Sequence, residues 1–213
     1  MSLTDPSSLA APDEDIPLSD VLTRDLLRSG KLDRMVAAAV PGLRLMSDAE
    51  REASLRQTLA ARPAAEEGAW VFAYGSLMWN PTIHHVDRRV ARVEGWHRSF
   101  CLSTPIGRGT PENPGLVLAL DEGGCYRPVW VPLHDSRGEV FGQGIAFAID
   151  PAGPQCVRLG EAETVRRLAT ARGQIGSSAD YLFRTREGLE ALGLSDPAIE
   201  RLAALVAGFG AAA

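Results

Sequence analysis

Apolar residues near the start of the chain follow a helical pattern. Residues 18–27 carry them at amphipathic spacing, so a helix is expected there, ending at Ser29-Gly30. A second helix is expected over residues 47–61, because Ser47 and Glu50 stand in the capping-box pattern. The first part of the chain therefore predicts two helices.

Between residues 70 and 149 the pattern changes to short apolar runs separated by turn signals such as Gly-Gly and Asn-Pro. Runs so closely spaced favour an antiparallel or mixed sheet, or a small barrel. The expected strands cover residues 70–73, 88–93, 100–103, 115–120, 129–133 and 144–149.

The last third of the chain returns to helical patterning. Helices are expected over residues 160–171, with Gly173 at the C-cap, and over residues 178–188. Another is expected over residues 197–207, with Asp196 as its N-cap and proline in its first turn. Helices before and after a block of strands indicate the α+β class.

We divide the chain into a tail (1–15), a helical arm (16–66) and a main domain (67–213). The tail is rich in Ser, Pro and Asp, and it has neither the basic start nor the apolar core of a signal peptide. We expect it to be frayed and disordered. The main domain is long enough to bury one full hydrophobic core.

Composition argues against several classes of function. The 213 residues carry a net charge of −5, which gives no electrostatic reason to expect nucleic acid or an acidic membrane as partner. No apolar run approaches the roughly 20 residues of a membrane helix. Three cysteines occur without a C-x-x-C pair, and His84-His85 has the wrong spacing for a shared metal, so we expect buried thiols in a reducing compartment and no metal site.

Residues 70–81 (WVFAYGSLMWNP) hold the most informative pattern. An apolar strand runs directly into Tyr74-Gly75-Ser76-Leu77. Glycine allows a ligand to approach the main chain closely, so the amides of Gly75, Ser76 and Leu77 could form a nest for a carboxylate. An ordinary strand-to-turn corner would have the same sequence, and both interpretations stay open.

Six blocks of sequence, in order, resemble the ChaC family of γ-glutamylcyclotransferases over nearly the whole chain. The first is the stretch at residues 70–81. The others are GWHRSFC (95–101), RGTPENPG (108–115), CYRP (125–128), ATARG (169–173) and ADYLF (179–183).

The resemblance implies a compact β-barrel flanked by N- and C-terminal helices, in a cytoplasmic enzyme without a cofactor. It implies cleavage of glutathione to 5-oxoproline and cysteinylglycine. In this reaction the α-amine of the γ-glutamyl group attacks its own γ-carbonyl, so proximity can supply much of the rate. Residues 74–77 would hold the α-carboxylate, and the Tyr74 hydroxyl would donate a further hydrogen bond.

The chain departs from the family pattern where the catalytic glutamate belongs. In the family a strand, a helix and this glutamate precede the CYRP block, whereas here Asp121-Glu122-Gly123-Gly124 runs directly into Cys125. About thirty residues are missing at the 124/125 junction, judged by usual element lengths. The favoured explanation is that the sequence omits a segment of the protein, because loss of a central strand would break the core.

Two further explanations are open. The deletion is real and the domain is an inactive γ-glutamyl-binding or regulatory domain, or Glu122 replaces the missing acid although its Gly-rich context is typical of an exposed turn. Arg108 is a candidate for the glycine carboxylate of glutathione, or else a solvated loop arginine. Tyr181 is a candidate for the pocket, or else a packed ring. The oligomeric state cannot be predicted.

Overall fold

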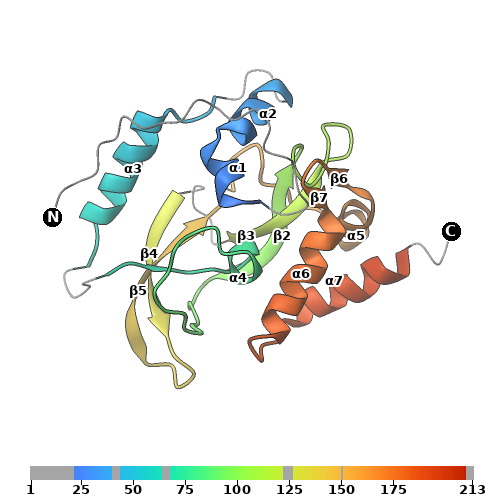
Figure 1. Ribbon diagram of the computed structural model, residues 1–213. Helices are drawn as coiled ribbons and strands as arrows, with labels where there is room; N and C mark the ends of the chain where they lie inside the picture. Colours follow the sequence, from blue (N-terminus) through green and yellow to red (C-terminus); the bar gives the residue numbers. More distant parts are fainter. Residues whose placement is uncertain (1–21, 40–43, 64–67, 122–126, 150, 210–213) are drawn as a thin grey trace.

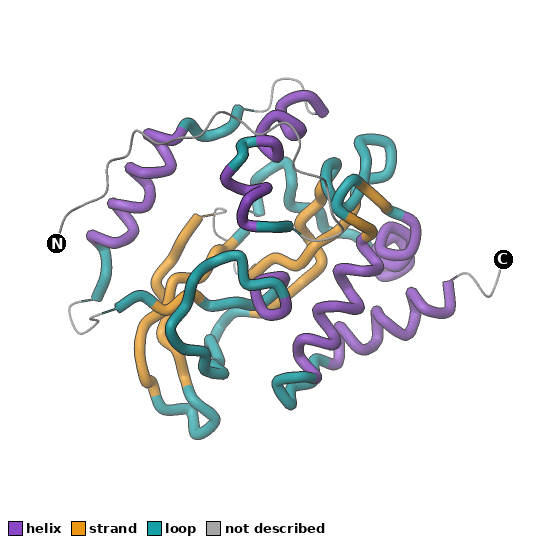
Figure 2. The backbone as a smooth tube through the Cα atoms, viewed as in Figure 1, coloured by secondary structure: helices purple, strands orange, loops and turns teal. Residues whose placement is uncertain are grey.

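A computed structural model describes residues 22–39, 44–63, 68–121, 127–149 and 151–209 (Figure 1). The expected tail (1–15) lies outside these residues, as does Glu122. The described residues form a mixed α+β fold, as expected. A five-stranded sheet occupies the middle, and the C-terminal helices lie against one side of it (Figures 1 and 2).

Strand β5 (Val140–Ala148) is the centre of the sheet. β4 (Arg127–His134) pairs with it in antiparallel fashion along the whole of one edge. The other edge is shared: β1 (Trp70–Val71) pairs in parallel with Gly144 and Ile145, whereas β3 (Gly115–Asp121) pairs through Leu120 and Ala148 alone. The sheet therefore forks beside β5, with β1 and β3 as its two arms.

β2 (His97–Thr104) completes the sheet by pairing with β3 in antiparallel fashion, with a bulge between Ser99 and Leu102. The sheet order is β1-β5-β3-β2, and β4 pairs with β5 outside that path. Within the described ranges β2 and β4 do not pair, so the sheet stays open and does not form the expected barrel. A bulge raises the local twist of a strand without closing a sheet.

One predicted strand is wrong. Residues 88–93 run as part of the long loop between β1 and β2 (Figure 2), with a single bridge from Arg92 to His134. The arginine side chains of this loop explain the result: Arg88 donates to the Met78 carbonyl at 3.2 Å, and the Arg89 guanidinium lies 3.9 Å from the centre of the Phe141 ring. Alternation of apolar and polar residues is therefore not enough to form a strand, because a strand must also pair along the edge of another strand.

Three C-terminal helices form the main core with the sheet. They are α5 (Glu161–Thr170), α6 (Ser178–Glu190) and α7 (Pro197–Gly208), close to the predicted bounds. α7 begins as predicted, with Asp196 as N-cap and proline in the first turn. Gly173 is not a C-cap: it belongs to a small hairpin, β6 (Arg172–Gly173) with β7 (Gly176–Ser177), where backbone atoms of the Gly107 region leave no room for a β-carbon.

Their apolar faces bury one continuous cluster against β2 and β3. Leu168 and Leu182 are fully buried in it, and Phe100 and Leu118 supply the sheet side. Burial of this kind supplies most of the stability of helices in globular proteins.

The N-terminal helices are attached more loosely. α1 (Arg24–Arg28) starts at Thr23, whose hydroxyl accepts a hydrogen bond from the Leu26 amide at 3.1 Å. Part of the helix predicted over residues 18–27 lies outside the described residues. α3 (Asp48–Ala60) has the predicted capping box of Ser47 and Glu50, but no buried residue.

A helix that the sequence analysis missed, α2 (Lys31–Ala39), follows α1 at once. The chain turns between them at Gly30, whose φ is +65°. A Ser-Gly pair ends a helix but does not exclude another directly after it.

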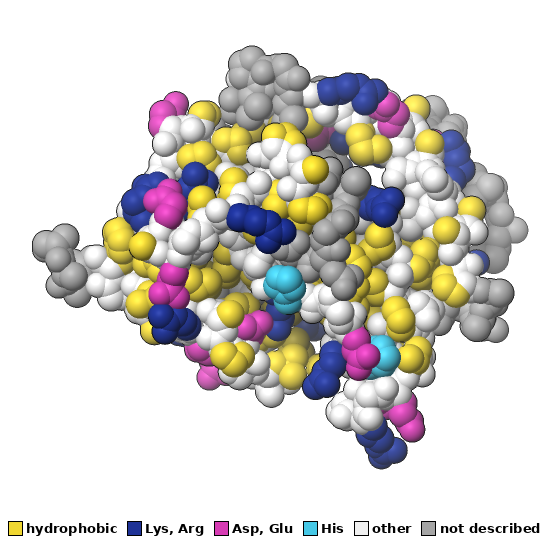
Figure 3. Space-filling model, turned by 180° about the vertical axis from the view of Figure 1, so that it is seen from behind, with side chains coloured by type: hydrophobic (Ala, Val, Ile, Leu, Met, Phe, Trp, Pro, Cys, Tyr) yellow, Lys and Arg dark blue, Asp and Glu magenta, His cyan; other side chains and the backbone are white. Residues whose placement is uncertain are grey.

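The surface carries mixed charge. On the face seen in Figure 3, acidic and basic side chains lie interspersed instead of gathering by sign. No helix in the described part of the chain is long and apolar enough to cross a membrane. Among the same residues, no group of three or more His, Cys, Asp or Glu is placed to hold a metal ion.

Candidate active site

A cavity of about 390 Å³ lies in the fork of the sheet. The chain that follows β1 forms one wall, and β2, β3 and α6 form the other. This volume is typical of sites for small ligands. The residues that line it are Leu22, Phe72–Leu77, Trp79, Asn80, Leu102–Thr104, Ile106, Arg108, Val117, Leu118, Phe147, Gln155, Ile175 and Tyr181.

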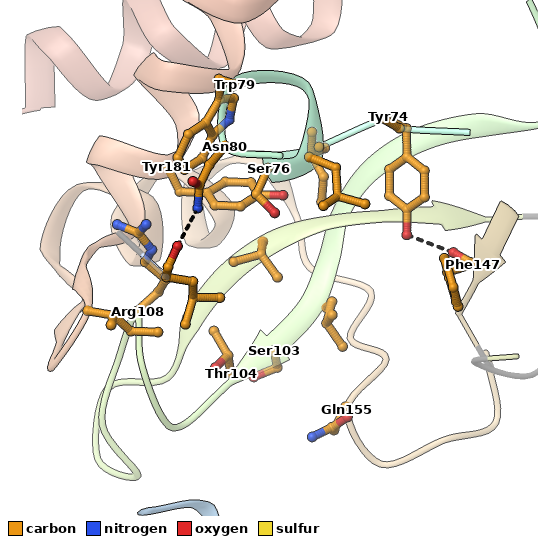
Figure 4. Close-up of a pocket in the computed structure, with 18 of the residues that line it drawn as sticks. Tyr74, Ser76, Trp79, Asn80, Ser103, Thr104, Arg108, Phe147, Gln155 and Tyr181 are labelled. Atoms are coloured by element: carbon orange, nitrogen blue, oxygen red, sulfur yellow. Dashed lines mark hydrogen bonds between the residues drawn. The ribbon is translucent and has the colours of Figure 1, made fainter. Parts of the chain in front are cut away.

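All six residues proposed from the sequence to bind substrate line this single cavity: Tyr74, Gly75, Ser76, Leu77, Arg108 and Tyr181. The corner beside residue 75 is therefore open, and not filled by packed side chains. The structure brings these residues together although Tyr74 and Tyr181 are 107 positions apart in the sequence (Figure 4).

The stretch after Tyr74 forms a short helix, α4 (Ser76–Trp79), with Gly75 as its N-cap. The Met78 amide donates to the Gly75 carbonyl at 2.9 Å, and no side chain of the described residues caps the helix start. The amides of Ser76 and Leu77 belong to a first turn that has no partners within its own helix. The corner that the sequence predicts as a nest is therefore a helix start; Gly75, with φ −139°, is not in the left-handed region.

Close packing, and not an unusual backbone angle, explains the glycine at position 75. A β-carbon there would lie 2.5 Å from the Tyr181 hydroxyl oxygen. Tyr181 is 6% exposed, and its ring packs edge-on against Trp79 and Phe100. The tyrosine is thus both a packed ring and a wall of the cavity, which unites the two interpretations that the sequence left open.

The Tyr74 hydroxyl has a protein partner, contrary to the role expected for it. It donates to the carbonyl of Phe147 in β5 at 2.7 Å (Figure 4). Its proton is therefore engaged, and the hydroxyl oxygen can act toward a ligand only as an acceptor.

Arg108 is a buried arginine and not a solvated one. Only 6% of it is exposed, and its Nη1 donates to the Ser177 carbonyl at 3.2 Å. The fully buried Ser178 hydroxyl fixes the main chain here, donating to the Arg108 carbonyl and accepting from the Leu116 amide. Arg108 is the one charged side chain among the described residues that line the cavity.

Asp180 adds to the electrostatics near this arginine. Burial raises the pKa of its carboxyl group, but hydrogen bonds from Ser177 and the positive charges of Arg172 and Arg108 outweigh burial and hold that pKa below its usual value. Asp180 therefore stays ionised and caps α6, accepting from the Ser177 amide at 3.1 Å. It does not line the cavity.

Sequence reasoning missed several wall residues, among them Leu22, Phe147 and Gln155. Each comes from a segment without a recognisable motif, and only the folded chain brings it to the cavity. Trp79 was part of the quoted stretch but had no assigned role; its Nε1 donates to the buried Thr185 hydroxyl at 3.1 Å and joins α4 to α6.

The ChaC-like protein family matches residues 69–158 of this chain. The glutathione-specific gamma-glutamylcyclotransferase of Escherichia coli K12 is 35% identical over 85% of this chain and 90% of its own. The chain belongs to this ChaC-like family. The glutathione-specific gamma-glutamylcyclotransferase 1 of Danio rerio is 36% identical, over 58% of this chain and 80% of its own.

A solved structure shares the fold of this ChaC-like chain. The crystal structure of a yeast γ-glutamyl cyclotransferase specific to glutathione superimposes with a TM-score of 0.59 and 19% identity. The match covers 67% of this chain and 99% of the yeast chain.

The two sequence alignments are longer than the parts of this ChaC-like chain that they cover. The Escherichia coli alignment spans 213 residues, whereas 85% of this chain is about 180. The Danio rerio alignment spans 159, whereas 58% of this chain is about 125. Both relatives therefore have roughly thirty residues without a counterpart here, the size inferred from usual element lengths for the gap at 124/125.

Proposed function

We propose that this protein is a γ-glutamylcyclotransferase that cleaves glutathione to 5-oxoproline and cysteinylglycine. The observation that carries the proposal is the meeting of three of the family's sequence blocks, 70–81, 108–115 and 179–183, in one cavity. This cavity has the amides of a helix start at one wall and the buried Arg108 at another. The relatives named above are glutathione-specific, which supports glutathione as the substrate.

The proposed arrangement uses both ends of the substrate. The amides of Ser76 and Leu77 receive the α-carboxylate of the γ-glutamyl group, as a helix start binds anions. The guanidinium of Arg108 receives the glycine carboxylate. Held at both ends, the γ-glutamyl chain folds back so that its α-amine lies beside its own γ-carbonyl.

The reaction transfers one proton and needs no added reagent. The amine nitrogen forms a bond to the γ-carbon, and the bond from that carbon to the cysteine nitrogen breaks. The proton that the amine loses moves to the leaving nitrogen, which departs as the amine of cysteinylglycine. A carboxylate with a pKa raised toward neutrality is suited to carry that proton.

The described lining of the cavity holds no carboxylate, so the acid/base group must come from elsewhere. Glu122 is the candidate within the sequence. Two positions earlier in the chain, Leu120 pairs with Ala148, the neighbour of the lining residue Phe147. We propose Glu122 for this role if the chain is continuous at 124/125, and a glutamate of the additional segment if it is not.

The geometry on either side of the junction allows a continuous chain. Leu120 and Arg127 pair with the same residue, Ala148, from opposite edges of β5. They are thus about two strand spacings apart, near 10 Å. The six residues between them reach at least about 20 Å when extended. An additional strand at this place would offer the pairing edge that a closed barrel needs, and we propose barrel closure only for a chain that contains it.

Peptide mass spectrometry decides between these chains. Arg127 precedes Pro128, and trypsin does not cleave an Arg–Pro bond. The next Lys or Arg is Arg137, so trypsin releases residues 109–137 as one peptide if the chain is continuous. A purified protein that lacks this peptide contains the additional segment. If the peptide is present, Glu122→Gln should abolish turnover, with Glu112→Gln as the matched control; equal rates for both variants would remove Glu122 from the mechanism.

The second candidate function is a γ-glutamyl-binding or regulatory domain without activity. The missing carboxylate in the described lining favours it. Incubation with glutathione and measurement of 5-oxoproline separates the two functions. Release above a heat-treated control supports the enzyme, whereas binding of S-methylglutathione without release supports the binding domain.

Replacing Ser76 tests the helix-start amides directly. Ser76→Pro removes one N–H at a first-turn position that tolerates proline. We expect a loss of about tenfold to a hundredfold in kcat/KM, the size of one lost hydrogen bond to a charged group. Ser76→Ala keeps the N–H and should retain most activity; a Ser76→Pro variant with the wild-type rate would contradict binding of the α-carboxylate by these amides.

We propose a cytoplasmic location. Cys156, within the described residues, is a free thiol. Free thiols are typical of proteins in reducing compartments.

A further inference from the structure

The N-terminal segment, residues 22–28, borders the cavity although it lies outside the matched family region. Leu22 is one of the lining residues. The side-chain amide of Asn80 donates to the Leu22 carbonyl at 2.9 Å, across 58 positions of sequence. In Figure 4 a dashed line drawn from Asn80 marks a bond of this site. The segment is therefore joined to the chain directly after α4.

A second group of contacts holds the same segment. Arg24 Nε donates to the Thr82 carbonyl at 3.0 Å, and the Arg24 guanidinium also contacts the His84 ring. Leu26 is fully buried, which fixes the inner face of α1. The segment is thus attached to residues 80–84 by polar contacts on both sides of the α1 start, and these contacts determine where Leu22 lies.

Leu22 lies at one particular end of the cavity. Figure 4 shows Asn80 and Arg108 toward one end, with Tyr74 and Phe147 at the other. Because Asn80 bonds to Leu22, the apolar Leu22 belongs to the Arg108 end. An apolar wall beside a buried guanidinium excludes water, and attraction between charges is stronger where water is excluded.

We propose that Leu22 forms a specificity wall, which closes the Arg108 end of the cavity and selects γ-glutamyl peptides that carry a carboxylate at their far end. The proposal rests on the proposed function, since it names the part of the substrate that this wall recognises. Leu22 acts on the ligand directly. Arg24 is a positioning residue, which acts by holding Leu22 in place.

The test compares glutathione with its C-terminal carboxamide, γ-Glu-Cys-Gly-NH2, which has the same shape without the terminal charge. The measured quantity is the ratio of kcat/KM for the acid to that for the amide. Leu22→Ala and Arg24→Ala should each lower this ratio about fivefold to tenfold, the size of one lost charge-assisted contact, mainly through KM for glutathione. Arg24→Lys keeps one donor for Thr82 and should recover part of the ratio.

Arg28→Ala is the matched control, because it removes an arginine from the same helix at an exposed position away from the cavity. Its ratio should equal that of the wild type. An unchanged ratio in both Leu22→Ala and Arg24→Ala, with wild-type thermal unfolding, would overturn the wall. An equal loss of kcat/KM for the acid and for the amide would also contradict the proposal.

Calorimetric titration with S-methylglutathione and its carboxamide distinguishes two results: that Leu22 has no effect on selectivity, and that the protein does not act on glutathione. If the wild type binds without turnover, the ratio of dissociation constants replaces that of kcat/KM, with the same expected change. If it neither binds nor cleaves glutathione, the proposed function fails and the wall has no such ligand. A variant with impaired folding is replaced by Leu22→Met, which should keep the wild-type ratio, and Leu22→Ser, which should lower it.

Discussion

The helices at the two ends of the chain are held to the sheet by different interactions. α5, α6 and α7 bury apolar side chains in one cluster with β2 and β3. α3 has no buried residue and is attached through single polar contacts, such as the hydrogen bond from the Trp130 indole N–H to the Thr58 carbonyl at 2.8 Å. The C-terminal helices therefore act as scaffold, whereas α3 is a surface attachment. α1 is intermediate, because Leu26 is fully buried but the neighbouring contacts are polar.

This contrast has a consequence for the site. Tyr181 and Arg108, at the C-terminal side of the cavity, are both 6% exposed and fixed by packing. Leu22, at the N-terminal side, depends on a few hydrogen bonds from residues 80–84. Changes in the arm should alter which ligand fits, and changes in the C-terminal helices should alter whether the site forms at all.

The largest expected effect concerns the core. Leu182→Ala removes a fully buried side chain from α6, whereas Leu55→Ala removes one from α3 that is 55% exposed. We expect the first to lower the free energy of unfolding by about 2–5 kcal/mol and the second to change it by less than about 0.5 kcal/mol. Denaturant unfolding measures both, and similar losses would contradict the distinction between scaffold and attachment.

The next effect concerns the contact between α6 and the start of α4. Gly75→Ala places a β-carbon against the Tyr181 hydroxyl and should cost about 1–3 kcal/mol of stability. Tyr181→Phe removes the clashing oxygen, so the double variant should be less destabilised than the sum of the single variants. A double-mutant cycle measures this coupling, and strict additivity would show that the clash is relieved in another way.

A smaller effect is expected where α3 meets β4. Trp130→Phe removes the indole N–H from the Thr58 carbonyl, in the last turn of α3, where carbonyls have no partner within the helix. The local stability of α3 should fall by about 0.5–1.5 kcal/mol. Hydrogen exchange should show faster exchange in α3 with α6 unaffected; unchanged protection of α3 would mean that this tether contributes nothing.

The smallest effect is electrostatic and belongs to the capping box of α3. Hydrogen bonds from the Ser47 backbone amide first, and from Arg44 second, lower the pKa of Glu50 from 4.5 to about 2. A lowered folded-state pKa means that this stabilisation of the helix start is complete above about pH 4.5 and is lost as the pH falls toward 2.

Carboxyl NMR titration of Glu50 checks this value. Arg44→Ala should raise the pKa only in part, because the Ser47 amide remains. A full return to 4.5 in that variant would assign the shift to Arg44 instead.

The sequence by itself determined those features that depend on neighbours along the chain. The capping box at Ser47 and Glu50 and the Asp196 cap were both identified from local pattern, because a helix start is decided within four residues. The helix α4 at Ser76–Trp79 was not predicted, although residues 74–77 were singled out. The main strands and C-terminal helices followed from period and turn signals.

Only the tertiary structure decided the features that join distant segments. Residues 88–93 alternate as a strand but make a single bridge, from Arg92 to His134, and the sheet stays open where a barrel was expected. The cavity joins Leu22, Gly75, Phe147 and Tyr181 because β1 and β3 diverge along the same edge of β5. Pairing across a sheet depends on which edges meet in three dimensions, and no local pattern specifies that.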